Sequence, residues 1–183
     1  MRLFAALVPP VGAVRDLEAA LAPTRPLVSD MQWTSPDDWH LTFAYFGNLS
    51  LSDAERLGSA MRELSHRLSS FEVHAEGVGT YPDPEHVEAL WAGVAPGGCL
   101  EEVATLVLEA VKGFGWALDR RGFRPQLLLG RSRTPVNAQS FINRMDSYSG
   151  PVWVFDSLVL LQARTTADGS VDLDIYDIHP LLG

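Results

Sequence analysis

One order of predicted elements occurs twice along the chain, and this repeat constrains the fold more than any other feature of the sequence. Short runs of β-branched and aromatic residues, typical of strands, alternate with apolar residues three or four apart, typical of helices. Strands are expected at residues 2–8, 40–46, 71–78, 89–94, 126–129, 152–163 and 171–178. Helices are expected at residues 11–21, 57–68, 100–111 and 138–145. Each half therefore runs strand, helix, strand, helix, strand.

This repeat predicts two similar lobes that face each other. If a pseudo-two-fold axis relates the halves, it brings together their middle strands, which begin with His40 and Gln126. We therefore predict an α+β fold in which antiparallel sheets with outer helices surround a central cleft. With 183 residues, 46% of them hydrophobic, the chain has the size of one domain. Within it we expect lobes of roughly residues 1–80 and 89–183, with the chain free to cross between them.

The charge of the chain limits the nucleic acid that it can bind. A formal net charge of -9 does not suit a long duplex, because gripping that backbone needs many cations to displace condensed counterions. Any phosphate ligand should therefore be small or engaged locally. Five of the 14 Lys and Arg residues do cluster, namely Arg120, Arg121, Arg124, Arg131 and Arg133. This cluster is either a solvated turn or part of a phosphate site.

Cysteine usage and the first residues bear on the cellular compartment. Cys99 is the single cysteine, which leaves no internal disulfide and no cysteine-based zinc cluster. The apolar run after Arg2 ends at Pro9-Pro10 and is too short for a signal peptide or a membrane span. No pair of histidines has the spacing of a local metal motif. We expect a cytoplasmic monomer that uses no metal, cofactor or membrane.

His40 and Thr42 are the first candidates for a functional site. Side chains two apart on a strand share a face, so the even-numbered residues from 40 to 46 should line one face and Tyr45 the other. An imidazole and a hydroxyl together on an inner face indicate a polar cleft. An isolated His-x-Thr pair, however, is more often a satisfied core or rim group than a site.

Several segments of the chain resemble one known family. The segment HLTFAYFG at residues 40–47 looks like the first His-x-Thr signature of the RNA 2',3'-cyclic phosphodiesterases, which belong to the two-histidine phosphoesterase superfamily. Further similar segments are RLFAAL at 2–7, GVGTYP at 77–82, LWAGV at 90–94 and FRP at 123–125. Their order and spacing also fit, so the resemblance covers most of the chain.

The resemblance implies a reaction and a role for each motif. The family opens a 2',3'-cyclic phosphate, at an RNA 3' end or in a small cyclic nucleotide, to leave a 2'-phosphate, and it needs no metal. The first histidine donates a proton to the departing 3' oxygen, and the second accepts a proton from the attacking water. The hydroxyl of each motif binds a phosphate oxygen. By position, His40 would be the proton donor and Thr42 a phosphate ligand.

The second motif departs from the family pattern at two positions. The corresponding segment of this chain is QLLLGR at residues 126–131. Gln126 stands at the position of the missing proton acceptor, and its neutral amide has no usable proton affinity near neutral pH. Leu128 stands at the position of the missing hydroxyl. Arg131 matches the family's basic residue and could bind phosphate, helped by Arg124 or Arg133.

Two functions are compatible with these departures. The chain is either a weakened cyclic phosphodiesterase, in which Gln126 only orients a water, or a catalytically inactive protein that keeps the cleft and binds nucleotides or phosphate. His86 and His179 are candidates for a replacement base. Four large aromatic residues could stack a nucleobase, although such residues are more often core: Trp91, Trp116, Trp153 and Tyr81.

Overall fold

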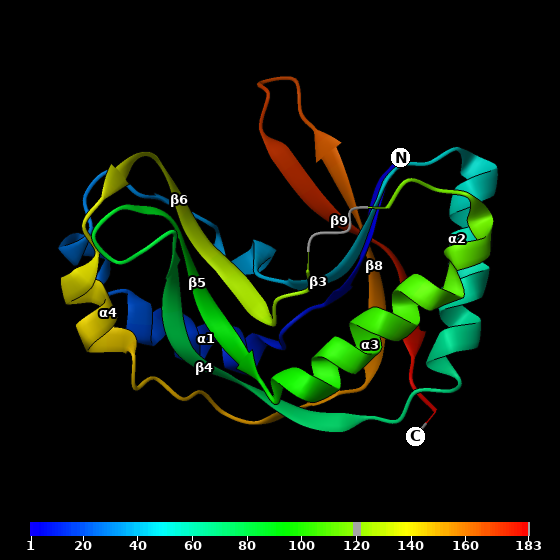
Figure 1. Cartoon of the computed structure of the whole chain (residues 1–183), viewed down its shortest axis with the longest axis horizontal. Coiled ribbons are helices and arrows are strands. Elements are labelled where there is room, and N and C mark those ends of the chain that lie inside the picture. Colours follow the sequence, from blue (N-terminus) through cyan, green and yellow to red (C-terminus); the bar gives the residue numbers. More distant parts are fainter. Residues whose placement is uncertain (119–121, 183) are drawn as a thin grey trace.

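A computed structural model describes residues 1–118 and 122–182, which form two antiparallel sheets and four α-helices (Figure 1). The four-stranded sheet has the order β3 (Leu41–Asn48), β1 (Arg2–Leu7), β8 (Ser157–Thr165), β9 (Val171–Pro180). The five-stranded sheet has the order β2 (Gln32–Trp33), β6 (Gln126–Val136), β5 (Val87–Ala95), β4 (Phe71–Tyr81), β7 (Trp153–Phe155). The predicted α+β fold with antiparallel sheets is confirmed.

Each sheet takes strands from both halves of the sequence. The first two strands of a half stay together, since β1 pairs with β3 and β5 pairs with β6. The third strand of each half lies in the other sheet, where β4 pairs with β5 and β8 pairs with β1. The chain therefore crosses between the sheets on both sides of the boundary expected near residues 80 and 89. Each half thus contributes its third strand to the sheet of the other half, as a pseudo-two-fold repeat requires.

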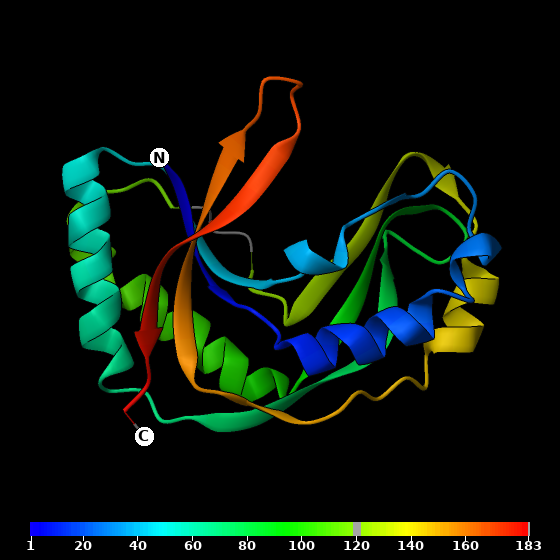
Figure 2. The same ribbon diagram turned by 180° about the vertical axis from the view of Figure 1, so that it is seen from behind.

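The helices cover the outer sides of the sheets (Figures 1 and 2). Helices α1 (Val11–Leu21) and α4 (Gln139–Met145) lie along the five-stranded sheet, and α2 (Leu51–Ser65) and α3 (Gly97–Ala110) along the four-stranded sheet. Their apolar stripes enter one continuous core. A separate cluster of Phe4, Ala6, Val159 and Leu161 lies on the opposite face of the four-stranded sheet, because side chains alternate along β1 and β8. No described helix is long and apolar enough to cross a membrane.

Two strand predictions are wrong in extent. The run 152–163 is not one strand, because the chain changes sheets at Asp156: β7 pairs with β4, and β8 pairs with β1. A continuous apolar run cannot reveal such a change. Strand β6 does not end at Gly130 but continues to Val136. A Cβ at Gly130 would lie 3.0 Å from the backbone oxygen of Gln32, so this glycine allows β2 to approach and does not end the strand.

Candidate active site

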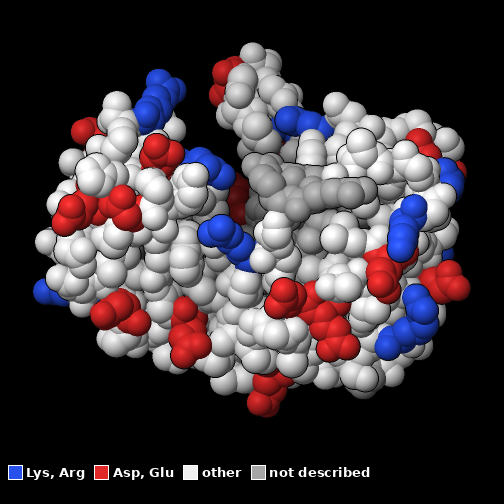
Figure 3. Space-filling model, in the orientation of Figure 1, with Lys and Arg blue, Asp and Glu red and all other residues white. Residues whose placement is uncertain are grey.

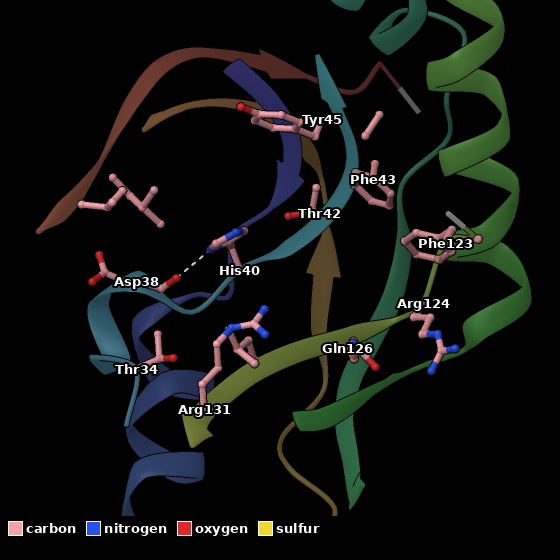
Figure 4. A pocket seen from close by; sticks show the side chains of 15 residues that line it. Thr34, Asp38, His40, Thr42, Phe43, Tyr45, Phe123, Arg124, Gln126 and Arg131 are labelled. Atoms are coloured by element: carbon pink, nitrogen blue, oxygen red, sulfur yellow. Dashed lines mark hydrogen bonds between the residues drawn. The ribbon is translucent and has the colours of Figure 1, made fainter. Parts of the chain in front are cut away.

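A cavity of about 640 Å³ lies between the two middle strands, β3 and β6. Figure 4 shows His40 just before β3, Thr42 and Tyr45 along β3, and Gln126 and Arg131 along β6. Further lining residues come from the segments that lead into these strands and from β9, namely Thr34, Asp38, Phe123, Arg124, Val171 and Leu173. The repeat therefore does bring its two middle strands to one cavity, with the two motifs on opposite sides.

A bulge in β3 decides which of its side chains line the cavity. In the pairing with β1, Thr42 stands opposite Ala6 and Ala44 opposite Ala5, so Phe43 is the extra residue. The bulge shifts the alternation by one residue beyond this point. Tyr45 consequently lines the cavity, whereas Phe46 is buried in the core. The prediction that Tyr45 faces away from His40 and Thr42 is wrong, because it assumed an unbroken period of two.

An equivalent bulge lies in β6. Leu128 stands opposite Trp91 and Gly130 opposite Leu90, which makes Leu129 the extra residue. The side chains of Gln126, Leu128 and Arg131 therefore line the cavity, while Leu129 is buried in the core. The apolar side chain of Leu128 occupies the place at which the resemblance implies a hydroxyl.

The hydrogen bonding of His40 sets its tautomer. Its Nδ1 lies 2.7 Å from the backbone carbonyl oxygen of Asp38 (Figure 4). A carbonyl oxygen only accepts, so Nδ1 donates this bond and Nε2 is the nitrogen that can exchange a proton with a ligand. Burial lowers the pKa of His40 below its usual value, and the hydrogen bond and charge of Asp38 oppose this shift. The neutral imidazole is therefore favoured near neutral pH.

Two arginines give the cavity its positive charge. Arg131 and Arg124 both line it, and within residues 1–118 and 122–182 neither guanidinium is paired with a carboxylate. In the space-filling view, basic side chains lie at the hollow of this face, and acidic side chains are spread over the rest of it (Figure 3). A small anion would therefore meet unpaired cations here even though the whole chain carries a net charge of -9.

Other candidate residues lie away from this cavity. Arg133 lines a separate depression, because residues 132–135 of β6 stand opposite the single residue Glu88 and carry Arg133 outward. His86 is exposed and its Nδ1 lies 3.0 Å from a carboxylate oxygen of Asp83. His179 is buried near the end of β9, with Nε2 3.5 Å from Asp177. Arg120 and Arg121 lie outside the described residues.

Among the described residues, His40 is the only histidine that lines the cavity. Neither His86 nor His179 does so, so neither faces a ligand bound there. In the same part of the chain, no three His, Cys, Asp or Glu side chains are grouped in a way that could hold a metal ion.

Several residues of the cavity were not predicted from the sequence. Asp38 and Thr34 belong to the polar segment before β3, and that position was the signal that could have found them. Val171 and Leu173 come from β9 and add apolar side chains to the lining. No local signal points to these two, because β9 reaches the cavity only through the sheet order.

Comparisons with known proteins agree with this architecture. The family described as LigT like Phosphoesterase matches residues 8–91. An RNA 2',3'-cyclic phosphodiesterase of Archaeoglobus fulgidus is 28% identical over 180 residues, which covers 97% of this chain and 100% of the relative. A protein of the same name from Geobacillus stearothermophilus is 25% identical over 154 residues, covering 82% of this chain. The match covers only 48% of that relative, so the chain spans about half of its length.

A solved structure shows the same fold. The crystal structure of E. coli LigT complexed with 3'-AMP superposes with a TM-score of 0.77 and 18% sequence identity, over 100% of this chain and 98% of the LigT chain. The sequence similarity and the shared fold together support the two-histidine phosphoesterase family, and the chain is similar to its LigT-like members.

Proposed function

We propose that the chain binds nucleotide or RNA 2',3'-cyclic phosphates in this cavity and opens them slowly to 2'-phosphates. The observation that carries the proposal is that His40, with a defined tautomer, lines the same cavity as Thr42 and Arg131. Support also comes from relatives named RNA 2',3'-cyclic phosphodiesterase and from the similar fold of a LigT that binds 3'-AMP.

His40 acts as the proton donor in this proposal. A water oxygen attacks phosphorus, the bond from phosphorus to the 3' oxygen breaks, and that oxygen takes the proton from Nε2 of the protonated imidazole. Nδ1 keeps its bond to Asp38, so the ring stays oriented during the transfer. The hydroxyl of Thr42 donates a hydrogen bond to a phosphate oxygen, and Arg131 stabilises the growing negative charge.

Gln126 and Leu128 make this reaction slow. Gln126 can hold the attacking water by hydrogen bonds but cannot accept its proton, which therefore passes to solvent. The lost general base costs about 10² to 10⁴ in rate, and the lost hydroxyl at Leu128 about 10² to 10³. Binding suffers less, because charge-assisted hydrogen bonds from Arg131 do not depend on a base.

The same two residues favour a second candidate function, a nucleotide-binding protein without turnover. In that case His40, Thr42 and Arg131 form a phosphate site in which the histidine only donates a hydrogen bond. No histidine other than His40 lines the cavity within the described residues, so none replaces the missing base there.

One experiment separates the two functions. Adenosine 2',3'-cyclic phosphate is incubated with the protein and with a His40→Ala variant, and formation of adenosine 2'-phosphate is followed. Binding of adenosine 3'-phosphate is measured by calorimetry on the same samples. Faster turnover by the unaltered protein supports the enzyme, and binding without such turnover supports the binding protein. If the unaltered protein neither binds nor turns over, both candidates are rejected.

A further inference from the structure

A second cavity, of about 450 Å³, opens on the face of the five-stranded sheet that carries Gln126. The two cavities share Arg124 and Gln126 among their lining residues. A ligand bound between His40 and Arg131 could therefore extend past Gln126 without leaving the surface of the sheet.

Two rows of residues on this face of the sheet run from β4 to β6. One row holds Gly79, Trp91 and Leu128, and the other, two residues further along β5, holds Glu76, Gly93 and Gln126. Four of these residues line the second cavity and form its floor, namely Trp91, Glu76, Gly93 and Gln126. A Cβ at Gly93 would lie 2.5 Å from the backbone oxygen of Glu76. This close approach leaves no room for a side chain, so the floor stays open between the polar groups of Glu76 and Gln126.

Trp91 supplies a flat aromatic surface beside this opening. Its indole lies over Gly79, where a Cβ would come within 2.0 Å of Cζ2, so only glycine lets the ring lie against the sheet. The other four tryptophans of the chain all pack in the apolar core, whereas Trp91 packs in neither apolar cluster and is half-buried. The common role of a large aromatic residue, to fill the core, therefore does not account for Trp91.

We propose that this second cavity binds a nucleobase stacked on Trp91. It would be a subsite for the nucleotide on the 5' side of the terminal nucleotide of an RNA 3' end. The indole face suits any base, because every base has a π-face. The carboxylate of Glu76 accepts hydrogen bonds from base N–H groups, and the amide of Gln126 can donate or accept them. Arg124, which lines both cavities, binds the phosphate that joins the two nucleotides.

The size of the first cavity indicates that the subsite serves a second nucleotide. At about 640 Å³ the first cavity falls in the range that encloses a ligand of mononucleotide size, and Tyr45 and Leu173 line it for an aromatic base. The second cavity is then available to a neighbouring nucleotide. This inference rests on the proposed function of the first cavity, and it makes an RNA end of two or more nucleotides the preferred substrate over a free cyclic mononucleotide.

The test compares two ligands that cannot be hydrolysed by this reaction. Adenosine 3'-phosphate and the adenosine dinucleotide ending in a 3'-phosphate are titrated calorimetrically into the full chain and into Trp91→Leu. The unaltered protein should bind the dinucleotide about tenfold or more tighter, the effect expected of one base stacked on an aromatic ring. Trp91→Leu should lose most of this preference and keep its affinity for the mononucleotide within about threefold. Tyr81→Leu, which removes an exposed aromatic residue of the same sheet outside both cavities, should change neither.

If Trp91→Leu folds poorly, a second variant, Trp91→Tyr, and fluorescence measurements still test the subsite. Tyrosine keeps a stacking ring, so this variant should retain most of the dinucleotide preference. In the unaltered protein the dinucleotide should quench tryptophan emission more than the mononucleotide does, and Trp91→Tyr should remove that difference. Equal affinities for the two ligands, or an equal loss of both in Trp91→Leu, would overturn the subsite while leaving the proposed function intact. Absence of binding by either ligand would reject both.

Discussion

Tyr45 and Arg131 occupy equivalent places in the two halves of the molecule. Each lies five residues after the first cavity residue of its motif, His40 or Gln126, and each lines the cavity because a bulge precedes it. The pseudo-symmetry thus puts an aromatic ring on one side of the cavity and a guanidinium on the other. In the proposed function, Tyr45 would contact the base, and Arg131 would bind the phosphate from the side opposite His40 and Thr42.

The first prediction concerns Arg131. Arg131→Ala should weaken the binding of adenosine 3'-phosphate by about tenfold to a hundredfold, since a charge-assisted hydrogen bond is lost, and binding should then depend less on salt. Arg133→Ala is the matched control, because it removes the same charge from a separate depression and should have little effect. Calorimetry at several salt concentrations measures both. Equal losses in the two variants would mean that only overall charge matters.

The second prediction restores the proposed catalytic groups. Gln126→His with Leu128→Thr should raise the hydrolysis of adenosine 2',3'-cyclic phosphate by about 10² or more, because it supplies a base with a pKa near neutrality and a hydroxyl for the phosphate. Gln126→His alone should recover part of this gain, and the two effects should be non-additive because both act on one transition state. A folded double variant that binds nucleotide but gains no rate would show that the cavity is built for a different ligand.

The third prediction follows from the lowered pKa of His40. A proton donor is active only when protonated, so kcat/KM should be highest at acid pH and fall as pH rises through a midpoint below the usual value of 6.5. Because Gln126 cannot act as a base, kcat/KM should show no rising limb at lower pH from the deprotonation of a histidine at this position. In Gln126→His the introduced imidazole must be neutral to accept a proton, which should add a rising limb and give a bell-shaped profile. A rate of the unaltered protein that instead rises through this region would make His40 the base.

The fourth prediction tests the packing of Trp91 against Gly79. Gly79→Ala should lower the free energy of unfolding by about 1 to 3 kcal/mol, as expected for overpacking, because the new Cβ would fall within 2.0 Å of the indole. In a Trp91→Leu background the same substitution should cost clearly less, since the ring is gone. Urea denaturation of the four proteins gives this double-mutant cycle. An equal cost in both backgrounds would point to the backbone of β4 and not to the ring.

The sequence by itself determined the elements and the chemical limits of the site. The helical stripe of Leu57, Met61 and Leu64 is buried as its spacing predicts, because that period depends on neighbours within a few residues. The start of one middle strand at Gln126, and of the other within one residue of His40, likewise followed from local pattern. The inability of Gln126 to act as a base is a property of its amide and needs no structure.

Only the tertiary structure decided which side chains meet. The bulges that turn Tyr45 and Arg131 into the cavity are set by pairing with β1 and β5, strands distant in the sequence, so no local period could reveal them. The same holds for Leu173, which reaches the cavity through the sheet order, and for Arg133, which an outward bend of β6 removes from it. Local spacing fixes the direction of a side chain only while the hydrogen-bonded ladder is regular, and at this site the ladder is irregular on both sides.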